Sequence, residues 1–248
     1  MFFAGQINGT TGYAEAAAQG LVAGINAVLK SRGEAPMTLG RHECYIGVLI
    51  DDLVTKGTSE PYRMFTSRAE YRLLFNAGSA ELRLIDHAKK YGLLSSNRLQ
   101  AIDDKRDAVL SWVVKLENER TKGGTWAEAI RRSADLQFDF LPQEFASLSG
   151  AIREEVLYRV RYRGYLDREY VQIKKLSELE SIKISVDFNY AAVKSLRTEC
   201  RQKLQIIKPQ TLAQANRISG VNPADISVLM VALRAQGAHP SLHHDVLP

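Results

Sequence analysis

The sequence predicts a mainly α-helical protein in which a short α/β segment precedes helical domains. From about residue 80 onward, apolar residues recur three or four positions apart, which is the spacing of one buried helix face. Before that point, two short apolar or aromatic runs, residues 2–4 and 45–50, have the composition of strands. With 248 residues, of which 45% are apolar, the chain can bury more than one core.

The first predicted strand ends at Ala4, and residues 5–12 are too rich in Gly, Asn and Thr to extend it. A helix is then expected from about Thr11 to Ser31, ended by Gly33. Small residues recur every four positions within this helix, so one of its faces should lie close to a sheet or a ligand. These residues are Ala16, Gly20 and Gly24.

Residues 45–50 predict a buried strand that ends at Asp51-Asp52 and is followed by turn residues up to Pro61. After a loop at 76–79 the pattern becomes helical, with two apolar stripes. The first stripe contains Leu82, Leu84, Ile85 and Ala88, and the second contains Ala108, Leu110, Trp112, Val113 and Leu116.

Residues 121–124 predict a break, and residues 134–149 predict loops with short helices. Residues 151–179 fit both a strand pattern and a helix pattern, and we favour one long helix because Glu154, Glu155, Arg159 and Arg163 fit i,i+4 pairing.

Two further helices are expected at about 190–206 and 211–218. A last helix should begin with Asn222 as its cap, Pro223 at its first position and Asp225 in its first turn. Its apolar face would hold Ile226, Leu229, Met230 and Leu233, and the tail from Gly237, with three histidines, would be frayed. We therefore expect three domains, at 1–80, 81–183 and 184–248.

Composition excludes several classes of protein. No run reaches the roughly 18 apolar residues of a membrane-spanning helix, so we expect no membrane span. Residues 1–4 are too short for a signal-peptide core, which predicts a cytoplasmic location. Cys44 and Cys200 form no CxxC pair, so we expect two buried thiols and no metal site.

Positive charge is concentrated in one segment. Residues 151–208 contain 13 Lys and Arg against 8 acidic residues, a net +5 that equals the net charge of the whole chain. Such a segment suits a polyanionic partner such as a nucleic acid, but solvated helix faces give similar counts.

A glycine-rich loop that opens a helix gathers free backbone N–H groups at the positive end of the helix dipole, where a phosphate or an electron-rich ring can bind. The loop at 5–12 is not GxGxxG, so dinucleotide phosphate binding is not its most natural use. A tight connection that binds nothing fits the pattern equally well.

Four segments give the loop a more specific interpretation. They read FFAGQINGTTGY at 2–13, YIGVLIDDL at 45–53, EPYRMFTSRAEYRL at 60–73 and QANRISGVNPADI at 214–226. In this order they resemble the carboxyl-terminal part of the GidA (MnmG) family, flavoproteins of tRNA wobble-uridine modification. The resemblance covers essentially the whole chain but only about the last two fifths of the family's length.

This resemblance implies that Gln6 contacts FAD and that the loop beside it lies next to the isoalloxazine. The implied FAD-binding residues are Gln6, Asn8, Gly9, Thr10, Thr11, Gly12 and Tyr13. One departure is Ala14, which stands where the family usually has Glu and leaves Glu15 alone at the helix start.

The resemblance also implies an activity: formation of 5-carboxymethylaminomethyluridine at the tRNA wobble position, with NADH as electron source and an MnmE-type GTPase as partner. The full-length protein would be a homodimer. The family's Gly-x-Gly-x-x-Gly motif, NAD-binding insertion and catalytic cysteines are not found in this sequence. We therefore assign no catalytic residue here, and expect that the chain alone can neither hold FAD nor catalyse the reaction.

Two arginine groups are candidate tRNA contacts. Arg63, Arg68 and Arg72 alternate with Tyr62, Phe65 and Tyr71, a mixture that can bind phosphates and stack on unpaired bases. Arg159 and Arg163 share a helix face, whereas Arg161 lies elsewhere. The alternatives are an internally paired segment containing Glu60 and Glu70 for the first group, and a solvated face for the second.

The small terminal domain is assigned by the resemblance to docking of the GTPase and tRNA. Two other functions stay open at this point: a stand-alone tRNA-binding module, and a protein-interaction module with no role in RNA binding.

Overall fold

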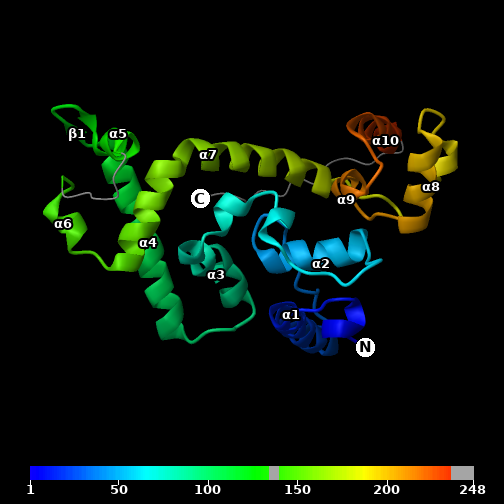
Figure 1. Cartoon of the computed structure of the whole chain (residues 1–248). Coiled ribbons are helices and arrows are strands. Elements are labelled where there is room, and N and C mark those ends of the chain that lie inside the picture. The colour runs from blue at the N-terminus through cyan, green and yellow to red at the C-terminus, as the bar shows by residue number, and fades with distance from the viewer. Residues whose placement is uncertain (134–139, 236–248) are drawn as a thin grey trace. The chain divides into compact units, whose positions relative to one another are not determined.

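The computed structural model describes residues 1–133 and 140–235. Within them the chain is mainly helical, as predicted, and its regular strands form one two-stranded hairpin (Figure 1). The helices are α1 (Tyr13–Ser31), α2 (Tyr45–Thr55), α3 (Ala80–Lys90), α4 (Ser96–Asn118), α5 (Trp126–Arg132), α6 (Gln143–Ala146), α7 (Gly150–Ser181), α8 (Thr198–Ile207), α9 (Leu212–Arg217) and α10 (Pro223–Ala235), and the strands are β1 (Arg120–Thr121) and β2 (Gly124–Thr125).

The chain divides into two compact units that do not follow the sequence order. The first contains Met1–Phe2, Gly20–Val48 and Met64–Glu169, and the second contains Phe3–Gln19, Leu49–Arg63 and Tyr170–Pro248. The second unit therefore contains both the glycine-rich loop and the terminal helices. The three-domain division stays a prediction.

The core of the first unit is built by α3, α4, α5, α6 and the beginning of α7. α4 packs against α3 and α5, and its Val109 and Leu116 are completely buried. Of the stripe predicted on α3, Leu82, Ile85 and Ala88 are buried, and Leu84 is half-buried. Val109, absent from the predicted stripe on α4, is more deeply buried than Leu110.

The second unit has its own core in the terminal bundle, where α9 packs against α10 and apolar residues from 182 to 233 form one cluster. The predicted start of α10 is confirmed. Asn222 Oδ1 accepts from the amide of Asp225 at 2.9 Å, and Asp225 Oδ2 accepts from the amide of Asn222 at 3.0 Å. Ile226, Leu229 and Leu233 of the predicted apolar face are buried.

Helix α7 confirms the single long helix favoured at 151–179, and α1 ends as predicted before Gly33, which has φ 71°. The predicted break at 121–124 is the turn of the β1–β2 hairpin. The histidine-containing tail and residues 134–139 lie outside the described residues.

The strand predicted at 45–50 is wrong, because these residues begin helix α2. A short, continuous apolar run has no period, so its pattern does not separate strand from helix. Asp51 and Asp52 continue this helix instead of ending a strand. The Asp52 side chain is buried, where it accepts from Tyr62 Oη at 2.9 Å and pairs with Lys56 one turn later at 2.7 Å.

The strand predicted at 2–4 does not form either. Ala4 has an extended backbone, with φ −147° and ψ 149°, but residues 1–4 have no strand partner among the described residues. Extended backbone becomes a strand only when a neighbour completes its hydrogen bonds.

The helix predicted at 190–206 starts only at Thr198. Before it, Tyr190–Ala192 is a 3₁₀ helix, followed by an i→i+3 turn from Val193 to Leu196. Consecutive three-residue turns bury Tyr190, Val193 and Leu196 at the spacing expected of a helix, which explains the misreading.

Candidate functional site

The glycine-rich loop is a 3₁₀ helix, Gly5–Asn8, enclosed by two left-handed glycines. Gly5 has φ 84° and Gly9 has φ 83°, a backbone conformation that favours glycine. The Gly9 amide donates to Gln6 O at 2.8 Å, which closes the turn. Beyond it, Gly9 O accepts from the Tyr62 amide at 2.7 Å, and the Thr11 amide donates to Tyr62 O at 3.2 Å. The loop is thus fixed to the segment that contains Tyr62.

Gln19, from the second turn of α1, joins three loop residues through its buried side-chain amide. Its Oε1 accepts from the Gly5 amide at 3.1 Å and from Asn8 Nδ2 at 2.6 Å. Its Nε2 donates to Thr10 Oγ1 at 2.9 Å, and that hydroxyl donates to Gly5 O at 3.1 Å. The sequence analysis did not select Gln19 as a site residue. The feature that could have indicated it is a single polar residue among the small and apolar residues at 16–24 of the predicted helix.

The loop presents only some of its predicted FAD-binding residues to solvent. Gln6, Thr11 and Tyr13 are exposed, the last almost completely, whereas Asn8, Gly9 and Gly12 are half-buried. Thr10 is 2% exposed, and its hydroxyl is used inside the loop. The exposed side chains lie beside the amino-terminal end of α1, where the helix dipole is positive.

The small residues of α1 have different surroundings. A Cβ built on Gly5 would lie 3.6 Å from Ala16 Cβ, so Ala16 faces the loop closely. At Gly20 and Gly24, no described atom outside the helix lies within 4 Å of such a Cβ. The close approach expected along the whole small face is therefore made only at Ala16 in the described part of the chain.

In the first arginine group, two of the three aromatic residues do not offer stacking surfaces. Tyr62 and Tyr71 are buried, which corrects the expectation for these two rings. Phe65 is exposed, with the Arg68 guanidinium 6.0 Å from its ring centre. Arg63 and Arg72 are exposed.

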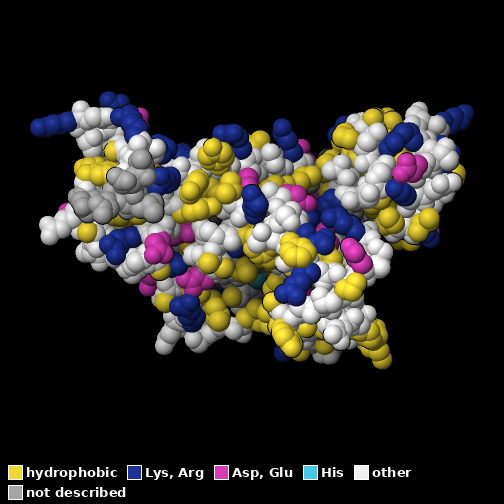
Figure 2. All heavy atoms as spheres, viewed as in Figure 1, with side chains coloured by type: hydrophobic (Ala, Val, Ile, Leu, Met, Phe, Trp, Pro, Cys, Tyr) yellow, Lys and Arg dark blue, Asp and Glu magenta, His cyan; other side chains and the backbone are white. Residues whose placement is uncertain are grey.

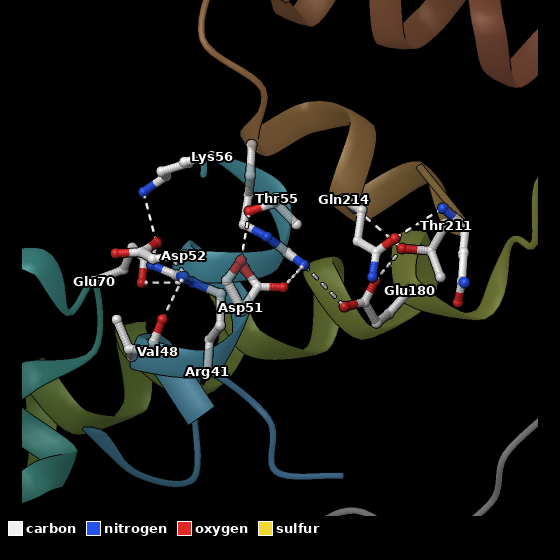
Figure 3. Close-up of polar contacts among 12 residues, drawn as sticks. Arg41, Val48, Asp51, Asp52, Thr55, Lys56, Glu70, Glu180, Thr211 and Gln214 are labelled. Carbon is white, nitrogen blue, oxygen red and sulfur yellow. Dashed lines mark hydrogen bonds and ion pairs between the residues drawn. The ribbon is translucent and has the colours of Figure 1, made fainter. Parts of the chain in front are cut away.

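Arg41, which sequence reasoning did not select, holds this segment. The Arg41 side chain is buried. It donates from Nη2 to Glu70 Oε1 at 2.8 Å and from Nη1 to the Val48 carbonyl at 3.3 Å (Figure 3). Nη2 also donates to the Arg68 carbonyl at 3.4 Å. Glu70 is thus paired internally, as the alternative interpretation of this segment expected.

The arginines predicted on α7 are also paired within the protein. Arg159 donates to Glu155 at 2.7 Å, the i,i+4 pair that the sequence predicted, and the Glu155 side chain is almost completely buried. Arg163 lies 3.2 Å from Glu117 and 3.7 Å from Asp167. Burial alone would raise the pKa of Glu117, but hydrogen bonds from Arg131 and Arg163 outweigh it and lower the pKa.

An exposed aromatic and basic surface lies further along α7, where Figure 2 shows basic side chains beside hydrophobic ones. Tyr165 is 55% exposed, with the Arg168 guanidinium 4.9 Å from its ring centre, and Tyr162 one turn earlier is 38% exposed. A planar ring beside a guanidinium can stack on an unpaired base. Neither Tyr165 nor Arg168 was among the predicted contacts.

Two family models match the chain. Residues 172–244 match the tRNA modifying enzyme MnmG/GidA C-terminal helical bundle, and residues 1–35 match glucose inhibited division protein A. The chain is 46% identical over 255 residues to the tRNA uridine 5-carboxymethylaminomethyl modification enzyme MnmG of Latilactobacillus sakei subsp. sakei. This chain belongs to the GidA/MnmG family.

The similarity covers most of this chain but a smaller part of each relative. The Latilactobacillus protein and a Lactobacillus acidophilus protein of the same name, 42% identical, each match 94% of the chain. The chain spans about 40% of the length of these curated relatives. Among solved structures, Aquifex aeolicus GidA in its form I crystal matches 93% of the chain and 38% of its own, with 42% identity and a TM-score of 0.80.

The GidA/MnmG helical bundle is tied to the end of α2 by Arg217, at the carboxyl end of α9. Arg217 Nη2 lies 2.8 Å from Asp51 Oδ1 and 3.2 Å from Glu180 Oε1. Figure 3 shows Asp51 on α2, Glu180 on α7 and Thr211 before α9, with Thr211 Oγ1 donating to Glu180. These contacts all lie within the second unit.

Neither a cluster of metal ligands nor a membrane-spanning helix is found among the described residues. They contain no group of three His, Cys, Asp or Glu side chains that could hold a metal ion. None of the described helices is both long enough and apolar enough to cross a membrane. Cys44 and Cys200 are buried free thiols, as predicted.

Proposed function

We propose that this chain is part of a flavoprotein that modifies the wobble uridine of tRNA to 5-carboxymethylaminomethyluridine. The names of these relatives support the reaction, and the conformation of the loop supports the flavin. The single observation that carries the proposal is a loop fixed by Tyr62 and Gln19 that leaves Gln6 and Tyr13 exposed at the start of α1.

The exposed residues fit one wall of a flavin site. The Gln6 amide can both donate to and accept from the polar edge of a flavin ring, and the exposed Tyr13 ring offers a flat apolar surface. The exposed Ile7 side chain adds apolar contact area beside them. Thr10, with its hydroxyl used internally, would act only through its backbone.

When bound, FAD would supply the redox chemistry, and NADH its electrons. The residues of this chain would orient the ring and keep water from the face that they cover. The loop itself, residues 5–13, contains no cysteine, and the chain spans about 40% of its relatives' length. We propose that this activity is cytoplasmic and belongs to a homodimer of the longer protein.

We propose that tRNA binds through exposed basic side chains of this chain. Of the five predicted arginines, Arg63, Arg72 and Arg163 are exposed, and exposed guanidinium groups suit phosphate contacts. The exposed pair Tyr165 and Arg168 would stack on an unpaired base.

The terminal bundle would dock an MnmE-type GTPase. Its exposed apolar side chains support this part of the proposal, since such groups stay in contact with water unless a partner covers them. They include Ile206 at 81% and Val231 at 69% exposure.

A chimera tests the proposed function. The chain replaces the matching 40% of the Latilactobacillus sakei relative, to which it is 46% identical, and the chimera is produced in cells that lack their own enzyme. We expect a yellow protein, with 5-carboxymethylaminomethyluridine restored in tRNA nucleosides analysed by mass spectrometry. A folded chimera that is colourless and leaves the uridine unmodified would disprove the proposal.

A stand-alone tRNA-binding module is the second candidate, favoured by the exposed Tyr165–Arg168 pair. The unmodified chain would then bind tRNA with steep salt dependence while the chimera stays inactive.

A further inference from the structure

We propose that Gln19 is the positioning residue of the loop, which sets its backbone so that Gln6 is presented to the flavin. Gln19 does not itself line the exposed face. It is 5% exposed and acts through Gly5, Asn8 and Thr10. This inference rests on the proposed function for the flavin, but the conformation of the loop can be tested without it.

The Gly5 peptide groups are held on both sides by a closed ring of hydrogen bonds. The Gly5 amide donates to Gln19 Oε1, Gln19 Nε2 donates to Thr10 Oγ1, and Thr10 Oγ1 donates to Gly5 O. A residue whose amide and carbonyl are both engaged cannot rotate without breaking two bonds. Gly5 is therefore fixed in its left-handed conformation, and Gln6 is the next residue.

A second arm from Gln19 fixes the other end of the turn. Gln19 Oε1 also accepts from Asn8 Nδ2, which donates in addition to the Phe3 carbonyl at 3.0 Å. The 3₁₀ helix Gly5–Asn8 is thus held at its first and last residues by one side-chain amide. Gln6, between them, is left exposed.

Only glutamine suits these contacts. Oε1 must accept twice while Nε2 donates, which requires a primary amide, and a carboxylate can only accept. Asparagine has the amide but is one methylene shorter. Because the buried Gly5 N–H needs an acceptor, Oε1 of Gln19 must face it, and this sets the orientation of the Gln19 side-chain amide.

The first experiment measures the loop itself in the whole chain. Gln19→Met keeps the length of the side chain and removes every contact of the ring, so we expect the Gly5 amide to exchange its hydrogen at least about tenfold faster by NMR. Gln19→Glu keeps two accepting contacts and should fall between Met and the parent. Gln205→Met, on the exposed surface of α8, is the matched control and should leave Gly5 unchanged.

Thr10→Val opens the same ring from its other side, and provides a second test if Gln19→Met folds poorly. It should also speed hydrogen exchange at the Gly5 amide. Because Gln19→Met and Thr10→Val break the same ring, the variant with both changes should lower the free energy of opening by no more than the sum of the two single effects. Unchanged Gly5 exchange in both single variants would overturn the inference.

The second experiment measures FAD binding by the chimera described above. If Gln19→Met weakens binding of added FAD about tenfold, while Gln205→Met does not, the positioning role is supported. Unchanged FAD affinity in a variant whose loop exchanges faster would overturn it. A parent chimera that binds no FAD would refute the proposed function instead, and exchange at Gly5 would still decide whether Gln19 holds the loop.

Discussion

Arg217→Met should loosen the terminal bundle, because Arg217 makes the ion pairs that hold α9 to α2 and α7. Its side chain is 13% exposed and that of the facing Asp51 is 15% exposed, whereas the Glu180 side chain is about half exposed. A hydrogen bond to a charged group contributes about 1.5 to 3 kcal/mol when sheltered, and an exposed ion pair roughly 0 to 1 kcal/mol. The buried Arg217 Nε, which has no hydrogen-bond partner among the described residues, subtracts from this.

The balance is a loss of about 2 kcal/mol from the free energy of opening the second unit. This corresponds to roughly 30-fold faster amide exchange in peptides from α9 and α10, measured by mass spectrometry under native conditions. Both tryptophans, Trp112 and Trp126, lie in the first unit, so tryptophan fluorescence should report no change there.

Arg234→Met is the matched control, since Arg234 is an exposed arginine on α10. If the Arg217→Met and Arg234→Met variants exchanged at the same rate in α9 and α10, Arg217 would not hold the bundle, and the ion pairs would contribute nothing measurable.

Three further predictions test other parts of the structure. Gly47→Ala should destabilise the chain by about 1 to 3 kcal/mol in thermal denaturation, because the new Cβ would lie 2.2 Å from Gly40 O. Gly20→Ala places its Cβ in open space and should stabilise α1 by about 0.5 to 1 kcal/mol. Similar effects of the two substitutions would contradict the packing at Gly47. The lowered pKa of Glu117 contributes stability that is present above the unfolded value of about 4.3 and is lost as the pH falls through the folded value. Glu117→Gln should therefore flatten the acid side of a circular-dichroism titration, and an unchanged profile would exclude this carboxylate. Burial raises the pKa of Cys200 to about 11, so iodoacetamide at neutral pH should label it only after denaturation; labelling of the native protein would show that α8 opens readily.

Sequence patterns predicted the helices well where one face meets a core and the other meets water. The long helix α7 and the Asn222–Pro223 start of α10 followed from spacing and capping chemistry alone. The same reasoning failed where that contrast is missing. The run at 45–50 has no exposed residue, and the turns at 190–196 repeat every three residues, close to the helical period.

The site was predicted as a segment of chain but not as a set of contacts. The sequence placed the loop correctly before α1, yet it gave no means of telling Gln6, which is exposed, from Thr10, which is buried. That difference depends on the left-handed backbone at Gly5 and on the partner Gln19, and neither follows from residue spacing. Likewise, the carboxylates that face Arg159 and Arg163 became clear only from the packing around α7.

The ring formed by Gly5, Thr10 and Gln19 also bears on the order of folding. Its members span only fifteen consecutive residues, since the longest contact joins positions 14 apart. Contacts of such short range need little loop closure and can form early, as soon as the first turns of α1 exist. The link to Tyr62 joins positions about fifty apart and should close later. The loop would thus be shaped locally before its long-range anchor arrives.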